Sequence, residues 1–271
     1  MAPSTPPPPS KVSFAALTIA STAIRVISPF TIVISAAILR NNWLLYFLFE
    51  SGYLLFQYLN KYMDTYLFIF GTGGHAKVIF DLAEKTQLYT HIKFVSPENI
   101  IREFLGKEVI FEEIFLSEFD SVPVVLAIGD NVLRKKVLSR ILSQKKDFSF
   151  PSLIHNNATI ANNVNIGVGS IVMAGAIINI DTNVGNFTII NTNAVVEHDS
   201  KIGDFSHIAP NATLCGGCSV GDNSLIGASS TIIEGLTIGD SSIVAAGATV
   251  INSVPDRMLS KGVPAISWPI N

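Results

Sequence analysis

The chain has 271 residues, enough for one large domain or two modest ones, with a net charge of −3, a pI near 5.9 and 14% charged residues. This balance leaves no excess of Lys and Arg to neutralise a phosphate backbone, so nucleic acid is excluded as the expected partner. The two cysteines, Cys215 and Cys218, make no disulfide framework. Without a second cysteine pair they also predict no metal site.

The first 62 residues differ in composition from the rest. Residues 1–10 are rich in proline, and residues 12–59 are strongly apolar, with Arg25, Arg40 and Glu50 as their only charged residues. A spanning helix needs about 20 apolar residues, but Arg25 and Pro29 interrupt the first stretch. Two interpretations stay open. In the first, residues 12–59 contact the inner membrane and attach a cytoplasmic protein to it. In the second, residues 1–62 are an extension that is not part of the working protein.

Residues 63–152 predict a small Rossmann-like α/β domain. Tyr66–Phe70 is an apolar run that ends in the turn Gly71-Thr72-Gly73-Gly74-His75, and apolar residues recur with helical spacing over 76–85. This order is typical of a strand, a glycine turn and a helix. Glycines let the backbone approach a ligand, and the free N–H groups of a helix start attract phosphate.

A second strand and turn follow in the same domain. The apolar run 122–128 leads into Gly129-Asp130-Asn131 and then into a helix over 132–142 that carries Arg134. The carboxyl ends of parallel strands meet at one edge of a sheet, so both turns are expected to line one crevice. Because the glycine spacing departs from G-x-G-x-x-G, a nucleotide sugar is preferred over a dinucleotide as the ligand.

Residues 153–255 carry a six-residue repeat. All seventeen positions counted in sixes from Ile154 to Val250 are Ile, Leu or Val, and Gly and Asn crowd the positions between. A fixed period of this kind predicts a stacked coil in which each hexad gives one short strand and one corner, and three hexads give one turn. The aliphatic residue and the small residue two places before it are expected to point inward. Residues 256–271 are left as a C-terminal tail.

Two histidines lie inside the repeat. His198 stands between Glu197 and Asp199 at a corner, and an imidazole beside a carboxylate is the residue type that a general base needs. A solvated corner histidine is the alternative. His207 follows nine residues later as a ligand-facing or merely exposed group, and Asn191 is equally an ordinary corner residue.

Five sequence pieces, in order, resemble the PglD/NeuD-like sugar acyltransferases, over residues 64–265. The pieces are FIFGTGGHAKVIFDLA, LAIGDNVLRKK, FPSLIHNNATI, INTNAVVEHDSKIGDFSHIAP and GVPA. The resemblance implies a left-handed parallel β-helix after the α/β domain, acetyl-CoA as co-substrate without a metal, and a homotrimer.

The resemblance also implies roles for single residues. His198 would be the general base, oriented by Asp199, with Glu197 as the competing partner. Asn191 would touch the sugar. The remaining residues fall into two groups: His207, Gly216 and Ala246 would contact acetyl-CoA, and Gly71, Gly73, Gly74, His75, Gly129, Asn131 and Arg134 would bind the nucleotide diphosphate or lie near it.

The function expected from this resemblance is N-acetylation of a nucleotide-linked amino sugar, of the UDP-4-amino-4,6-dideoxy-sugar type, for a surface glycan. Two departures bear on it. The family's aspartate pair after the second strand is replaced by Ser96-Pro97, and the basic residue after GVPA is replaced by Ile266-Ser267, with Lys261 as the candidate to compensate for it. O-acetylation of sialic acid or a related sugar is one alternative. A non-catalytic, ligand-binding trimeric scaffold is the other.

Overall fold

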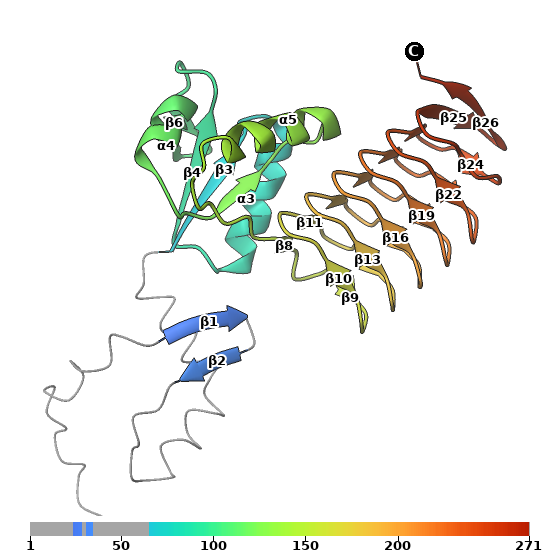
Figure 1. Cartoon of the computed structure of the whole chain (residues 1–271), viewed down its shortest axis with the longest axis horizontal. Coiled ribbons are helices and arrows are strands. Elements are labelled where there is room, and N and C mark those ends of the chain that lie inside the picture. The colour runs from blue at the N-terminus through green and yellow to red at the C-terminus, as the bar shows by residue number, and fades with distance from the viewer. Residues whose placement is uncertain (1–23, 29–30, 35–64, 271) are drawn as a thin grey trace, which may run out of the picture. The chain divides into compact units, whose positions relative to one another are not determined.

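The computed structural model describes residues 24–28, 31–34 and 65–270, and the chain divides into two compact units, residues 1–57 and 58–271. In the first unit, β1 (Ile24–Ser28) and β2 (Thr31–Ile34) pair as an antiparallel ribbon (Figure 1). The rest of the apolar stretch 12–59 lies outside the described residues, so membrane contact there stays a prediction. No helix among the described residues is long and apolar enough to cross a membrane.

The α/β domain at the start of the second unit is a five-stranded sheet covered by helices, in the strand order β5-β6-β4-β3-β7. Four strands are parallel, and β5 pairs antiparallel to β6 at the edge. The strands are β3 (Tyr66–Phe70), β4 (His91–Ser96), β5 (Glu103–Phe104), β6 (Lys107–Phe111) and β7 (Val124–Leu126). The helices are α3 (Gly74–Thr86), α4 (Glu112–Glu118) and α5 (Asn131–Leu142).

The central strand β3 is buried on both faces, as expected for a parallel sheet with helices on each side. Leu67 and Ile69 belong to a core with α3, whereas Phe68 and Phe70 pack with residues of α4 and α5. Successive side chains of a strand point to opposite faces, so one apolar run builds both halves of the core. The predicted strand over 66–70 is confirmed.

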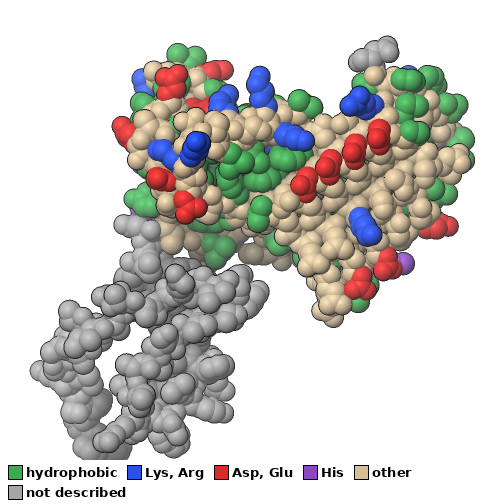
Figure 2. Space-filling model, viewed as in Figure 1, with side chains coloured by type: hydrophobic (Ala, Val, Ile, Leu, Met, Phe, Trp, Pro, Cys, Tyr) green, Lys and Arg blue, Asp and Glu red, His purple; other side chains and the backbone are tan. Residues whose placement is uncertain are grey.

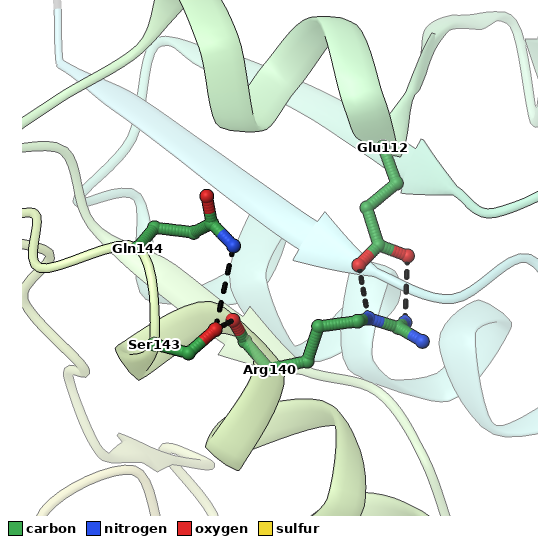
Figure 3. Close-up of polar contacts among 4 residues, drawn as sticks. All are labelled: Glu112, Arg140, Ser143 and Gln144. Atoms are coloured by element: carbon green, nitrogen blue, oxygen red, sulfur yellow. Dashed lines mark hydrogen bonds and ion pairs between the residues drawn. The ribbon is translucent and has the colours of Figure 1, made fainter.

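An ion pair between an exposed arginine and a buried glutamate joins the two helices on the second face of this sheet. Arg140 on α5 donates from Nε and Nη2 to the two carboxylate oxygens of Glu112 at the start of α4, at 2.6 and 2.7 Å (Figure 3). Glu112 is almost fully buried, and the fork geometry satisfies both of its oxygens. Removing Arg140 would therefore leave a buried carboxylate without its partner.

The second part of this unit is a parallel β-helix of two-residue strands, visible as the row of coils in Figure 1. Each strand pairs with the strand eighteen residues later, as Ile171 does with Ile189. The first face holds β8 (Leu153–Ile154), β11 (Ile171–Val172), β14 (Ile189–Ile190), β17 (His207–Ile208), β20 (Leu225–Ile226) and β23 (Ile243–Val244). The second holds β9 (Thr159–Ile160), β12 (Ile177–Ile178), β15 (Val195–Val196), β18 (Thr213–Leu214), β21 (Thr231–Ile232) and β24 (Thr249–Val250). The third holds β10 (Asn165–Ile166), β13 (Asn183–Val184), β16 (Lys201–Ile202), β19 (Ser219–Val220) and β22 (Thr237–Ile238).

The aliphatic residue of each hexad fills the interior of the coil from Val172 to Val250, as predicted. The first members depart from the prediction: Ile154 is exposed, and Ile160 and Ile166 are only half-buried. They belong to the first turn of the coil, which has no earlier turn stacked on it.

Buried hydroxyl groups link successive turns of the coil. The Oγ of Ser170 donates to the carbonyl of Gly185 at 2.7 Å and accepts from the backbone N–H of Thr188 at 3.0 Å. Ser224 repeats the arrangement with the carbonyl of Gly239 and the N–H of Ser242. The small inward residues of the repeat therefore satisfy buried backbone groups as well as fitting the available space.

Carboxylates form a second ladder along an outer corner. Oδ1 of Asp222, Asp240 and Asp256 each accepts from the backbone N–H of the aspartate one turn earlier, at 2.8–2.9 Å. Figure 2 shows a row of acidic side chains that runs along the coil.

The α/β domain covers the beginning of the first face. Leu153, Ile171 and Ile189, although outward on the coil, are buried in one core with Ile79 and other residues of α3 and its sheet.

The C-terminal tail forms two further strands. β25 (Met258–Gly262) continues the first face beside β23 and pairs with β26 (Ala265–Pro269). The first face therefore runs without a break from β8, under the α/β domain, to β26 near the C-terminus.

Candidate active site

His198 lies at the corner between β15 and β16, where the chain passes from the second face to the third. Its Nδ1 is 2.8 Å from Oδ2 of Asp199, and the two side chains are 57% and 66% exposed. Asp199 takes a left-handed backbone conformation, with φ of 59°, as the corner requires. The carboxylate fixes the proton on Nδ1 and leaves Nε2 to accept one from a ligand.

Glu197, the other carboxylate beside His198, has a different hydrogen-bond partner. Oε2 of Glu197 accepts a hydrogen bond from Nδ2 of Asn179 at 2.8 Å, one coil turn earlier. The structure therefore pairs His198 with Asp199. Asn179 was not among the predicted site residues, although its position eighteen residues before Glu197 marks it as the neighbour of that residue in the coil register.

The pKa of His198 is raised above its usual value, chiefly by the hydrogen bond to Asp199, with the charges of Asp199 and Glu197 adding to it. A raised pKa makes the imidazole a stronger base.

Gly216 lies directly under the His198 ring, one turn along the coil. A Cβ atom at Gly216 would be 2.6 Å from both Cε1 and Nε2 of His198. Any larger residue would therefore displace the imidazole. We call Glu197, His198, Asp199 and Gly216 the catalytic corner.

A second group of predicted residues meets where the α/β domain packs on the first face. His207 begins β17, and its Nε2 is 3.0 Å from Nδ2 of Asn191. The amide nitrogen can only donate, so Nε2 of His207 accepts. Burial and the charge of Arg134 lower the pKa of His207 to about 4.

His75 lies close to this pair, in the first turn of α3. Its Cγ would be 3.9 Å from a Cβ at Gly129, and its Nε2 is buried without a hydrogen-bond partner among the described residues. Burial, with the charges of neighbouring Arg134, lowers its pKa to about 4. We call His75, Gly129, Asn191 and His207 the junction cluster.

The predicted phosphate turn is open. Gly73 is the N-cap of α3, and no side chain of the described residues caps the helix, so its first N–H groups are available to an anion. Gly71 has φ of 125°, and a Cβ there would lie 3.0 Å from the carbonyl oxygen of Ala127 at the end of β7. The two strand-end turns are therefore adjacent, whereas Gly73 and Gly74 have free space around them.

Two residues predicted near the diphosphate have a different role. Arg134 is 1% exposed, and its five N–H groups all donate within the protein, so none is left for a ligand. Asn131 accepts from Arg134 and donates to the carbonyl of Ser224 on the coil. Correcting the prediction, both residues join the α/β domain to the coil.

Within one chain the two groups lie on different sides of the coil. The catalytic corner separates the second and third faces, and the first face, with His207, lies opposite that corner. Ala246 and Asn191 lie on the corner between the first and second faces. The residues predicted to contact acetyl-CoA are therefore divided between the two sides, since Gly216 belongs to the catalytic corner. Among the described residues, no group of three or more His, Cys, Asp or Glu side chains could hold a metal ion.

Comparison with known proteins accounts for both domains. The model of the PglD N-terminal domain matches residues 66–141, and that of the bacterial transferase hexapeptide (six repeats) matches 181–216 and 217–252. The acetyltransferase domain of PglB from Neisseria gonorrhoeae FA1090 is 31% identical, with a TM-score of 0.71, over 76% of this chain and 100% of that one. No curated protein matches significantly.

Two further solved structures are similar. PerB from Caulobacter crescentus, solved in complex with CoA and GDP-perosamine, is 35% identical, with a TM-score of 0.69, over 76% of this chain and 98% of that one. WeeI from Acinetobacter baumannii AYE is 27% identical, with a TM-score of 0.69, over 75% of this chain and 100% of that one.

The α/β domain followed by a left-handed β-helix thus defines a hexapeptide-repeat acetyltransferase. Within that class, the chain belongs to the PglD/NeuD-like sugar acetyltransferases, as its sequence pieces predicted.

Proposed function

We propose that the protein transfers an acetyl group from acetyl-CoA to the amino group of a nucleotide-linked amino sugar for surface-glycan synthesis. The observation that carries this proposal is the exposed His198–Asp199 pair above Gly216, in a chain 35% identical to a protein solved with CoA and GDP-perosamine. The corner supplies a base with a free ring nitrogen. The α/β domain supplies an uncapped helix start for the diphosphate.

The proposed chemistry is direct attack on the thioester. The amine nitrogen forms a bond to the acetyl carbon while Nε2 of His198 takes a proton from that nitrogen, and the C–S bond then breaks. The sulfur leaves as CoA and takes up the proton. Asp199 stabilises the imidazolium that exists between these two steps.

The nucleotide of the acceptor is the open part of this proposal. The end of β4 has Ser96-Pro97 in place of an aspartate pair that could bind uracil and ribose. Ser96 is buried, and its hydroxyl accepts from the backbone N–H of Glu98. The GDP-sugar of PerB makes a guanosine nucleotide a candidate of equal standing with UDP. O-acetylation of sialic acid uses the same machinery with a hydroxyl nucleophile.

We further propose that the working unit is a homotrimer in which one chain's catalytic corner faces another chain's junction cluster. The support is the position of His198 and His207 on opposite sides of one coil, which leaves each half-site incomplete. Sedimentation of the purified protein should give three chains per particle. A fully active monomer would contradict the shared site.

CoA release measured against a panel of UDP-, GDP- and dTDP-amino sugars and free sialic acid tests the acceptor. Turnover with one nucleotide amino sugar and no other acceptor is expected. Turnover with sialic acid alone would assign O-acetylation. A folded protein that binds acetyl-CoA but releases no CoA with any acceptor would favour the non-catalytic scaffold.

A further inference from the structure

Arg134 holds the α/β domain to two consecutive turns of the coil. Its Nε donates to the carbonyl of Phe187 at 2.9 Å, and Nη2 donates to the carbonyl of Phe205 at 2.7 Å, eighteen residues later. On the other side, Nη1 donates to the carbonyls of Ile128 and Gly129 in the turn after β7, at 2.9 and 3.2 Å. One guanidinium therefore connects the turn after β7 in the α/β domain to the corner between the third and first faces of the coil.

The same guanidinium lies within electrostatic range of the junction cluster. Its charge acts on both His75 and His207, and the charge of His75 also acts on His207 across the domain boundary. Asp130, the N-cap of α5, is the only carboxylate whose charge acts on Arg134 among the described residues, and its Oδ1 accepts from the backbone N–H of Leu133. The buried positive charge is thus balanced mainly by carbonyl dipoles.

We propose that Arg134 is a positioning residue for the acceptor: by joining the turn after β7 to two turns of the coil, it sets His75 against the His207–Asn191 pair. The proposal rests on the acetyltransferase function proposed above and adds to it a residue that touches no substrate. In this arrangement Arg134 fixes the distance between α3, which carries His75, and β17, which carries His207.

The hydrogen bonds of the junction cluster require a neutral His207. Nε2 of His207 accepts from the amide of Asn191, and a proton on that nitrogen would face an N–H donor. Turning the Asn191 amide over would not relieve this conflict without loss, because Oδ1 of Asn191 already accepts from the backbone N–H of Thr192 at 2.8 Å. The buried Nε2 of His75 has no hydrogen-bond partner in the described part of the chain and can bind the acceptor.

Histidine NMR titration of the wild-type protein and of Arg134→Gln, Arg134→Lys and Arg140→Gln tests the proposal without requiring turnover. Arg140→Gln is the matched control, because it removes a structural arginine from the same helix, where its partner is Glu112. In the wild type, His75 and His207 should stay neutral down to about pH 4. In Arg134→Gln both should titrate at higher pH, whereas Arg134→Lys, which keeps the charge, should shift them less.

Kinetics with the acceptor found in the panel supply the second readout. Arg134→Gln should raise the KM for the acceptor by about tenfold or more and add a second ionisation to the acidic limb of kcat/KM. Arg140→Gln should change neither. If Arg134→Gln does not fold, the titrations of the wild type and of Arg134→Lys still test the proposal.

Three results would overturn the inference. The first is titration of either histidine near pH 6.5 in the wild type, and the second is an unchanged titration and acceptor KM in a folded Arg134→Gln protein. The third is an equal shift in Arg140→Gln, which would mean that lost stability alone moves the titrations. An inactive wild type with the expected titrations would instead refute the proposed function and leave the role of Arg134 as a domain clamp.

Discussion

Replacing Gly216 with alanine tests whether the position of the His198 ring controls the reaction. The new Cβ would lie 2.6 Å from Nε2 and Cε1, well inside contact distance, and the backbone of Gly216 is in a region that alanine adopts without strain. Because His198 is an exposed side chain, the ring can swing away, but it then loses the 2.8 Å contact with Asp199. We therefore expect a folded protein with a misplaced base.

The magnitude follows from what a positioned base contributes. General-base catalysis is worth about 10²–10⁴-fold, and a misplacement of about 1 Å can cost about 10²-fold, so kcat of Gly216→Ala should fall about 10²-fold or more. Thermal unfolding should change little, since Gly→Ala at a compatible site alters stability by only about 0.4–1 kcal/mol.

The double variant His198→Ala/Gly216→Ala is the control. CoA release by the four proteins forms a double-mutant cycle, and Gly216→Ala should add no further loss once the imidazole is absent. A wild-type kcat in Gly216→Ala, or losses that multiply in the double variant, would refute the reasoning.

Three further predictions follow from single contacts. Asp199→Asn should lower the pKa of His198, moving the acidic limb of kcat/KM to lower pH while reducing the maximal rate, as pH–rate profiles would show; an unmoved limb would contradict the pairing. Ser170→Ala should lower the free energy of unfolding in urea by about 1–3 kcal/mol, because a buried carbonyl and a buried N–H lose their partner; a loss below about 0.5 kcal/mol would argue against the hydroxyl ladder. His75 and His207 have folded-state pKa values of about 4, below the 6.5 of the unfolded chain, so stability should be complete above pH 6.5 and decline by about 2–3 kcal/mol per histidine as the pH falls to 4; equal urea midpoints at pH 7 and 4.5 would contradict this.

The sequence predicted the coil well because its register is periodic. One aliphatic residue every six positions fixes which side chains point inward, so the buried row from Val172 to Val250 and the corner position of His198 both follow from counting. The α/β strand at 66–70 and its glycine turn were equally accessible, since apolar runs and glycines act locally.

Contacts between the domains could not be predicted in this way. Arg134 lies on a helix with basic neighbours and resembles a ligand-binding residue in the sequence, yet the packing of α5 on the coil buries it completely. Leu153 and Ile171 occupy outward positions of the repeat and are buried only because α3 covers them. The choice of Asp199 over Glu197 depends on corner geometry, which adjacency in sequence does not resolve.

The central claim is that acetyl transfer occurs at a site shared by two chains, with His198 from one and the phosphate turn from another. The two variants needed are His198→Ala and Gly73→Asp. An aspartate at Gly73 has free space, suits the N-cap of α3 and places a negative charge where the diphosphate would bind. Each variant alone should be inactive at low acceptor concentration.

Mixed trimers of the two variants, formed by co-refolding or co-expression in equal amounts, are the most direct test. If the site is shared, each mixed trimer contains one intact site in three, and random mixing should restore about a quarter of the wild-type CoA release. If the site lay within one chain, no intact site could form. Mixed trimers that stay inactive would therefore contradict the account.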